Sequence, residues 1–212
     1  MGHERRGEPV DGEAFSRALS SLKERGMTVL VVGAEACGAH EAVCRRLLGD
    51  EGRPRHRVFV SVDADSRTHV ESIVSADGSV RSIDYEHLRA RTADDPLGAL
   101  NLELIRTIDE VEDEAGTLAP GELRVCVDSV RPLLDVHDTE AVFRTIHAMT
   151  ARIVGASGFG HVHLPVDASH EAATLFPPLF DAVVDVRTDG SVHEHRWRLR
   201  DEGVTSGWIP VG

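Results

Sequence analysis

Short apolar runs rich in β-branched residues recur along this chain, and they limit the folds open to it more than any other feature. MTVLVV (27–32), RVFVSV (57–62) and LRVCV (123–127) are each too short for a helix and show little polar alternation. Such runs are typical of strands buried on both faces of a parallel sheet. Three further segments predict strands: SVRSI (79–83), FGHVHL (159–164) and AVVDV (182–186).

Amphipathic segments lie between these runs. Helices are predicted at about 11–25, 39–48, 97–115, 138–154 and 169–176. Strands that alternate with helices predict an α/β fold, with a mainly parallel sheet flanked by helices. The last segments, 194–200 and 205–211, predict a C-terminal antiparallel strand pair.

The length of 212 residues suits one domain. Residues 1–10 are polar and predict a flexible tail. The rest, 11–212, is expected to form a single domain, since no internal repeat or low-complexity linker divides it.

The charge balance narrows the choice of partners. Lys and Arg number 23 against 36 Asp and Glu, a net charge of −13, and only Lys23 is a lysine. Such a surface repels phosphate backbones and anionic lipid, so no direct nucleic-acid partner and no membrane partner is expected. An acidic, arginine-rich composition with few aromatics is typical of proteins from salt-loving cells.

The cysteine count and the hydropathy predict a cytoplasmic protein. Three cysteines in this length do not make a disulfide scaffold and fit a reducing cytosol. No apolar run reaches the roughly 18 residues of a membrane span. The opening MGHERRGEPVDGEAF has no apolar signal-peptide core.

The first strand leads into a loop with the glycine spacing of a phosphate-binding P-loop. A P-loop has the pattern G-x-x-x-x-G-K-[ST] between a strand and a helix. Gly33, Cys37 and Gly38 fit the loop, but Ala39 replaces the lysine and His40 the magnesium-binding hydroxyl. A helix N-terminus remains as a weak anion site. The alternative is that the two glycines only make a tight turn.

A second strand end supports the nucleotide interpretation. RVCVDS (124–129) has the form of a Walker B segment, whose aspartate holds Mg²⁺, and Asp128 is the matching residue. The alternative is that Asp128 caps the turn after the strand.

These segments together resemble the KaiC branch of the RecA-like P-loop ATPases. VCVDSVRPLL (125–134) is similar to the Walker B strand of these proteins and the turn after it, and LFDAVVDVR (179–187) to one of their closing strands. VFVSVD (58–63) resembles the segment that ends in their paired catalytic acids. The similarity covers about residues 15–211. It is most specific to a group of KaiC-like proteins from haloarchaea, and the function of that group is poorly defined.

The resemblance implies ATP and Mg²⁺ as ligands, with Asp63 and Asp128 as the catalytic residues if the chain is active. Ala64 stands where the second paired acid would be, and the Walker A lysine and hydroxyl are absent. Two of three catalytic elements are therefore altered, which predicts reduced ATP affinity and impaired hydrolysis. Pairing of RecA-like domains also makes self-association an expectation by analogy.

The histidines offer a different chemistry. His161 and His163 occupy alternate positions of one predicted strand and so share a face. His40, Asp63, Asp128 and His163 are all expected near the carboxyl edge of the sheet, where they form a candidate Zn²⁺ or Mn²⁺ site. The alternative is scattered polar residues at the rim.

Three other residue types carry weaker signals. Cys37 at a helix N-terminus suggests a thiol of lowered pKa, or simply a small apolar residue, while Cys126 is expected in the core. Ser129 lacks a G-x-S-x-G elbow, so no hydrolase triad is expected. Trp197 and Trp208 are expected either to pack the terminal strands or to face a partner.

The sequence therefore favours a pseudo-ATPase: a regulatory or signalling domain that binds nucleotide weakly or not at all and acts through a protein partner or self-association. The alternative is an enzyme, either a metal-dependent hydrolase or a residual ATPase that uses the His/Asp rim. A nucleotide sensor that binds without hydrolysis is a third hypothesis.

Overall fold

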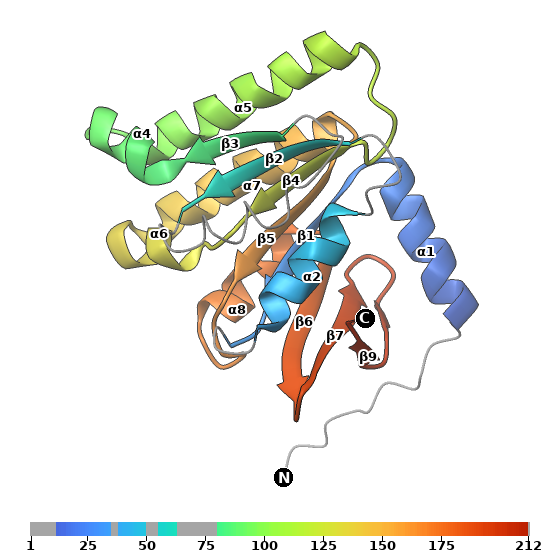
Figure 1. Ribbon diagram of the computed structural model, residues 1–212. Helices are drawn as coiled ribbons and strands as arrows, with labels where there is room; N and C mark the ends of the chain where they lie inside the picture. Colours follow the sequence, from blue (N-terminus) through green and yellow to red (C-terminus); the bar gives the residue numbers. More distant parts are fainter. Residues whose placement is uncertain (1–11, 35–37, 50–54, 63–79, 212) are drawn as a thin grey trace.

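The chain alternates strands and helices from its first described element to its last third. The computed structural model describes residues 12–34, 38–49, 55–62 and 80–211. The elements, in chain order (Figure 1), are α1 (Gly12–Glu24), β1 (Met27–Val32), α2 (Ala39–Leu48), β2 (His56–Ser61), β3 (Val80–Asp84), α4 (Tyr85–Arg91), α5 (Pro96–Ala115), β4 (Leu123–Val127), α6 (Arg131–Val136), α7 (Thr139–Gly155), β5 (Phe159–Leu164), α8 (Ala172–Leu175), the 3₁₀ turn η3 (Pro177–Leu179), β6 (Ala182–Asp189), β7 (Val192–Leu199), β8 (Val204–Thr205) and β9 (Ile209–Pro210).

One sheet organises the described residues. Its strand order is β3-β2-β4-β5-β1-β6-β7-β8, and β9 also pairs with β7. All the pairings from β3 to β6 are parallel. The pairing of β6 with β7 is antiparallel, as are those of β7 with β8 and β9. The predicted mainly parallel α/β sheet with antiparallel C-terminal strands is confirmed.

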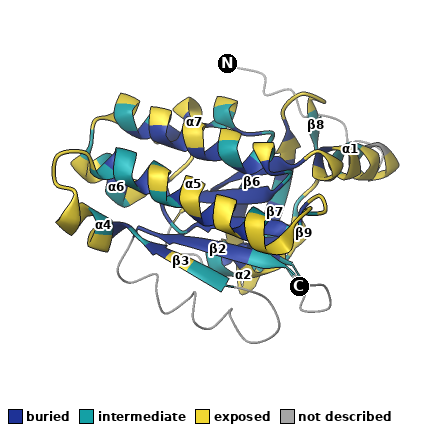
Figure 2. Cartoon of the chain, turned by 90° about the horizontal axis from the view of Figure 1, so that it is seen from above, coloured by how far each residue is buried: buried dark blue, intermediate teal, exposed yellow. Residues whose placement is uncertain are grey.

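Helices cover both faces of the sheet, and each face has its own core. On one face, apolar residues of α5 and α7 pack on alternate residues of the parallel strands, such as Leu30 and Val127. On the other face, α1 and α2 pack on the intervening residues, such as Val29 and Val31. Figure 2 shows the central strands buried while the outward faces of α5 and α7 are exposed.

Strand β5 lies at the centre of the sheet. Its side chains alternate between the two faces, and this alternation decides which of them lie beneath α2. Val162 and Leu164 belong to the core on the α5/α7 face. Phe159 belongs to the core on the opposite face, and His161 and His163 share its parity along the strand. All six residues of β5 are buried. Two imidazoles are thus placed inside the protein under α2.

Most predicted elements lie within two residues of the observed ones, and the differences have local causes. The main antiparallel partner of β7 is β6, not 205–211, which forms only the two-residue strands β8 and β9. Gly190-Ser191 between β6 and β7 is a recognised hairpin signal, and Gly190 has the positive φ of 61° that such turns need. Helix α8 is shorter than the predicted 169–176.

Two helices were not predicted. Helix α4 begins where the Asp84 carboxylate accepts a hydrogen bond from the His87 amide at 3.1 Å. Helix α6 is a single short segment with a proline in its first turn. Both are too short for their apolar spacing to stand out in the sequence. Nowhere in the part of the chain that the structure describes is a helix long and apolar enough to cross a membrane.

Candidate functional site at the carboxyl edge of the sheet

Strands β1, β2, β4 and β5 run parallel, so their carboxyl ends share one edge of the sheet. In open α/β sheets, ligands bind at this edge. The loop after β1 leads there into α2, whose first residues are Ala39 and His40. Ala39 is completely buried and packs in the core beneath α2.

The side chain of His40 is turned inward. Its Nε2 lies 2.9 Å from the carbonyl oxygen of Gly33, and its Nδ1 lies 3.0 Å from Nδ1 of His163. Burial, followed by the neighbouring His163, lowers the pKa of His40 to about 4. His40 is therefore neutral at neutral pH and carries one ring proton.

The hydrogen bonds fix where that proton lies. A carbonyl oxygen only accepts, so Nε2 of His40 must donate to Gly33. Nδ1 of His40 is then an acceptor, and the proton between the two rings belongs to Nδ1 of His163. The other ring nitrogen of His163, Nε2, is buried and has no hydrogen-bond partner among the described residues.

The structure explains why glycine stands at both positions of the loop, 33 and 38. A Cβ on Gly33 would lie 2.4 Å from the carbonyl oxygen of Val186 on β6, a backbone atom that cannot move freely. Gly38 has a φ of 60°, in the left-handed region that favours glycine, and precedes the first turn of α2. The tight-turn alternative thus accounts for these two positions without a phosphate.

Asp128 follows β4, as its Walker B match requires, and its carboxylate joins two strand ends. Oδ1 accepts a hydrogen bond from the Val62 amide at 2.9 Å, and Oδ2 accepts one from the Ser61 hydroxyl at 3.3 Å. The Asp128 amide in turn donates to the Val60 carbonyl at 3.1 Å. These hydrogen bonds join the carboxyl ends of β2 and β4, which is consistent with a structural role for Asp128.

The predicted metal set is only partly described. His40 and His163 are in direct contact through their Nδ1 atoms. Asp63 lies outside the described residues, as do Cys37 of the loop and the predicted tail 1–10. The site made of His40, Asp63, Asp128 and His163 therefore stays a prediction.

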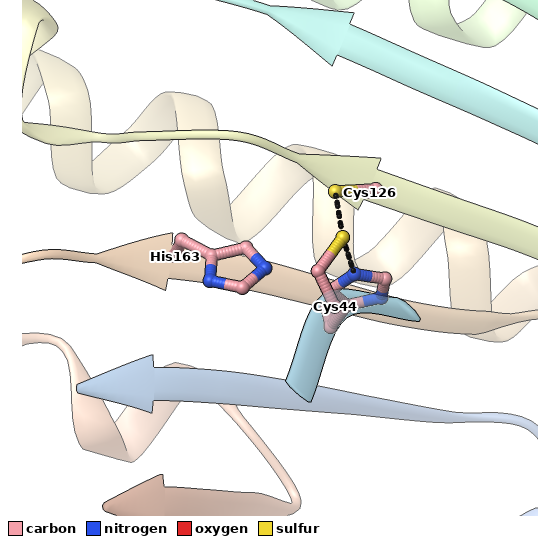
Figure 3. Close-up of side chains that lie close together, drawn as sticks. Cys44, Cys126 and His163 are labelled. Atoms are coloured by element: carbon pink, nitrogen blue, oxygen red, sulfur yellow. Dashed lines mark hydrogen bonds between the residues drawn. The ribbon is translucent and has the colours of Figure 1, made fainter. Parts of the chain in front are cut away.

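A different cluster of ligand-type side chains lies beside it. Among the described residues, Cys44, Cys126, His161 and His163 bring one sulfur or nitrogen each to within 4.8 Å of one another. The Cys44 and Cys126 sulfurs are 3.5 Å apart, and Nε2 of His161 is 3.3 Å from the Cys44 sulfur. Figure 3 shows one ring nitrogen of His163 facing the two sulfurs.

Three elements build this cluster. Cys44 comes from the middle of α2, Cys126 from β4, and both histidines from β5. Cys126 and His161 are direct neighbours in the parallel register of β4 and β5. All four residues are buried, Cys44 being the most exposed at 8%. The hydrogen bond between the thiols lowers the pKa of Cys44 and raises that of Cys126.

Sequence patterns identified only half of this cluster. The alternate spacing of His161 and His163 correctly placed both imidazoles on one strand face. Cys44 gave no signal of its own, and Cys126 was assigned to the core because its strand is apolar. Cys126 is indeed buried, at 2% exposure, but its sulfur faces Cys44 rather than only apolar side chains.

The remaining candidates, Ser129, Trp197 and Trp208, are each held by contacts within the protein. The Ser129 hydroxyl accepts a hydrogen bond from the Arg131 amide at 3.3 Å in the turn before α6. Trp197 is buried in the core on the α2 face. The guanidinium groups of Arg187 and Arg196 lie over the Trp208 ring, 4.0 and 4.8 Å from its centroid. Trp208 is thus held against the C-terminal strands.

Comparison with known proteins gives a fold and a family. Residues 26–186 match the model of DUF7504, which is described as a family of unknown function. No curated protein matches the chain. A KaiC-like protein, PH0186, from the hyperthermophilic archaeon Pyrococcus horikoshii OT3 has a similar structure, with a TM-score of 0.54 at 14% identity. The similarity covers 87% of this chain and 84% of that one. At this identity the similarity establishes the fold alone.

We predict that Gly33→Ala destabilises the protein by about 1–3 kcal/mol, because the new methyl group overlaps the β6 backbone. Gly155→Ala is the matched control: it ends α7 with open space around its Cα, so alanine there is neutral or slightly stabilising. Urea unfolding measures both. Equal stability of the two variants would contradict the close-approach explanation of Gly33.

We also predict that Asp128→Ala lowers the free energy of unfolding by about 1–3 kcal/mol in the absence of Mg²⁺ and nucleotide, because the Val62 amide loses its acceptor. Asp128→Asn should cost less, since its amide oxygen can replace one acceptor. Chemical denaturation in Mg²⁺-free buffer checks this. A neutral Asp128→Ala variant would show that the carboxylate has no structural role.

Proposed function

The chain belongs to the DUF7504 family, whose function is unknown, and we propose that it is a KaiC-like regulatory or signalling domain of the haloarchaeal cytoplasm. In this proposal it binds nucleotide weakly or not at all, hydrolyses none, and acts through contacts with a protein partner or a second copy of itself.

One observation carries the proposal: His40 is engaged inside the protein. In a P-loop, the residue at this position offers a hydroxyl to Mg²⁺, and the lysine before it reaches the terminal phosphates. Here the position of the lysine is the buried Ala39, and both ring nitrogens of His40 are engaged, by Gly33 and His163. Neither residue offers a positive charge or a free donor to a phosphate.

Two further features support the same conclusion. Asp128, the Walker B match, already accepts hydrogen bonds from Val62 and Ser61, which ties it to the end of β2. The net charge of −13 also disfavours the approach of a polyphosphate. A KaiC-like fold in which Ala39 is buried and His40 is engaged by protein groups is compatible with a domain used as a scaffold for protein contacts.

We predict no saturable binding when Mg-ATP, Mg-ADP or Mg-GTP is titrated into the protein at millimolar concentration. Calorimetry in molar KCl, the salt that the acidic composition suits, is the measurement. The Asp128→Asn variant serves as the matched control, and its heats should not differ from those of the unaltered chain.

Saturable heats would contradict the proposal and indicate a nucleotide sensor. Turnover of ATP that is lost in Asp128→Asn would instead support the alternative of a residual ATPase.

A further inference from the structure

We propose that Cys44, Cys126, His161 and His163 form a closed Zn²⁺ site that fastens α2 to strands β4 and β5. This site is distinct from the set of His40, Asp63, Asp128 and His163 expected from the sequence and shares only His163 with it. No ligand of the cluster belongs to the loop after β1, although His163 contacts His40, the residue on which the proposed function rests.

The distances within the cluster fit a tetrahedral S₂N₂ shell. With Zn–S and Zn–N bonds of about 2.3 and 2.05 Å, tetrahedral geometry places two sulfurs about 3.8 Å apart, and a sulfur and a nitrogen about 3.6 Å apart. The Cys44 and Cys126 sulfurs are 3.5 Å apart, and Nε2 of His161 is 3.3 Å from the Cys44 sulfur. The remaining pairs of ligand atoms lie within 4.8 Å of one another, so side-chain adjustments would bring all four to the ion.

The orientation of the His163 ring supplies the strongest argument for a cation. Its Nδ1 lies 3.0 Å from Nδ1 of His40, which leaves Nε2 as the ring nitrogen directed at the cluster. That Nε2 is buried, has no hydrogen-bond partner among the described residues, and is the ring nitrogen that faces the two sulfurs in Figure 3. A buried lone pair without a donor is costly, and a metal ion satisfies it.

His40 would support such a site by hydrogen bonding to the ligand His163 without binding the ion itself. Metal-bound histidines usually donate their second ring nitrogen to another group, which fixes the ring orientation. His163 donates to His40, which donates to the Gly33 carbonyl. The corresponding Nδ1 of His161 has no partner among the described residues. Of the two histidines, only His163 therefore has a hydrogen-bonded support, and its chain of hydrogen bonds through His40 to Gly33 connects the site to the loop after β1.

Charge also favours Zn²⁺ over an empty polar cluster. On binding, each thiol loses its proton to solvent, and the ion gains two thiolate and two neutral imidazole ligands. The charges of the ion and the two thiolates cancel, so the completed site is neutral, which suits a buried position. Two soft sulfurs and two imidazoles favour Zn²⁺ over Mg²⁺ or Ca²⁺.

The site is structural rather than catalytic. Four protein ligands fill a tetrahedral shell, whereas a catalytic zinc keeps one position for water or substrate. The burial of all four side chains, from 0% exposure for His161 to 8% for Cys44, is consistent with this role. The ligands come from three elements separated in the chain, so the ion would link α2 to the centre of the sheet.

The first test measures zinc in the full chain, made without a histidine tag, supplied with zinc and purified with a thiol reductant. We expect about one Zn²⁺ per chain by elemental analysis. Cys44→Ser, Cys126→Ser and His163→Gln should each lose most of it. His195→Gln is the matched control, because His195 is also buried, at 4% exposure, but lies on β7 outside the cluster; it should keep its zinc.

A second measurement applies to the unaltered chain, in case the variants fail to fold. Co²⁺ added to the metal-free, reduced protein should produce thiolate-to-cobalt charge-transfer absorption and the d–d bands of a tetrahedral site, both abolished by Zn²⁺. His40→Ala should weaken Co²⁺ affinity about 10- to 100-fold while keeping the charge-transfer band, as expected of a positioning residue.

Two results would overturn the proposal. One is reduced protein that holds no zinc and gives no cobalt bands. The other is a Cys44–Cys126 disulfide that persists in reductant, which would make the two cysteines a redox pair instead. Because neither readout involves nucleotide, failure here leaves the pseudo-ATPase proposal standing, and nucleotide binding would leave the zinc proposal standing.

Discussion

The hydrogen-bonded chain from His163 through His40 to the Gly33 carbonyl is the contact on which the carboxyl edge of this protein depends. It joins the end of β5, the first turn of α2 and the end of β1. Every donor in it meets an acceptor only if His40 is neutral, and burial keeps it so. One imidazole thereby joins three elements of the fold, at the position that we propose corresponds to the magnesium-binding hydroxyl of a P-loop.

The same contact sets the chemistry beneath α2. By accepting a hydrogen bond from Nδ1 of His163, His40 leaves the Nε2 of that ring directed toward the two cysteine sulfurs. In open α/β sheets, ligands bind at the carboxyl edge. In this chain the imidazoles of His161 and His163 also lie inside the protein beneath α2, where we infer that a metal ion compensates them.

Several parts of this arrangement follow from the sequence. The bounds of β1, β4 and β5 are predictable because buried parallel strands are short and largely apolar, and each of these is followed by a residue that ends it: Gly33, Asp128 or Pro165. The shared face of His161 and His163 follows from strand alternation alone. Helices α4 and α6 are too short to show a period. The β6–β7 hairpin does have a signal in the sequence, Gly190-Ser191, which the prediction of a 194–200 and 205–211 pair does not use.

The four-residue cluster shows why the rest is not accessible from one sequence. Cys44 and Cys126 are 82 residues apart, and no ligand spacing connects them. Their sulfurs meet only because α2 crosses over the β4–β5 pair, which is a consequence of tertiary packing. Asp128 was placed correctly after its strand, but its bonds to Ser61 and Val62 depend on the neighbouring strand.

The most direct test of this account is the protonation of the two histidine rings, measured by ¹⁵N–¹H correlation NMR of the imidazole nitrogens at neutral pH. We expect a neutral His40 with its proton on Nε2 and a His163 with its proton on Nδ1. A charged His40, or a His40 that carries its proton on Nδ1, would contradict it, since neither form could accept from His163 while donating to Gly33.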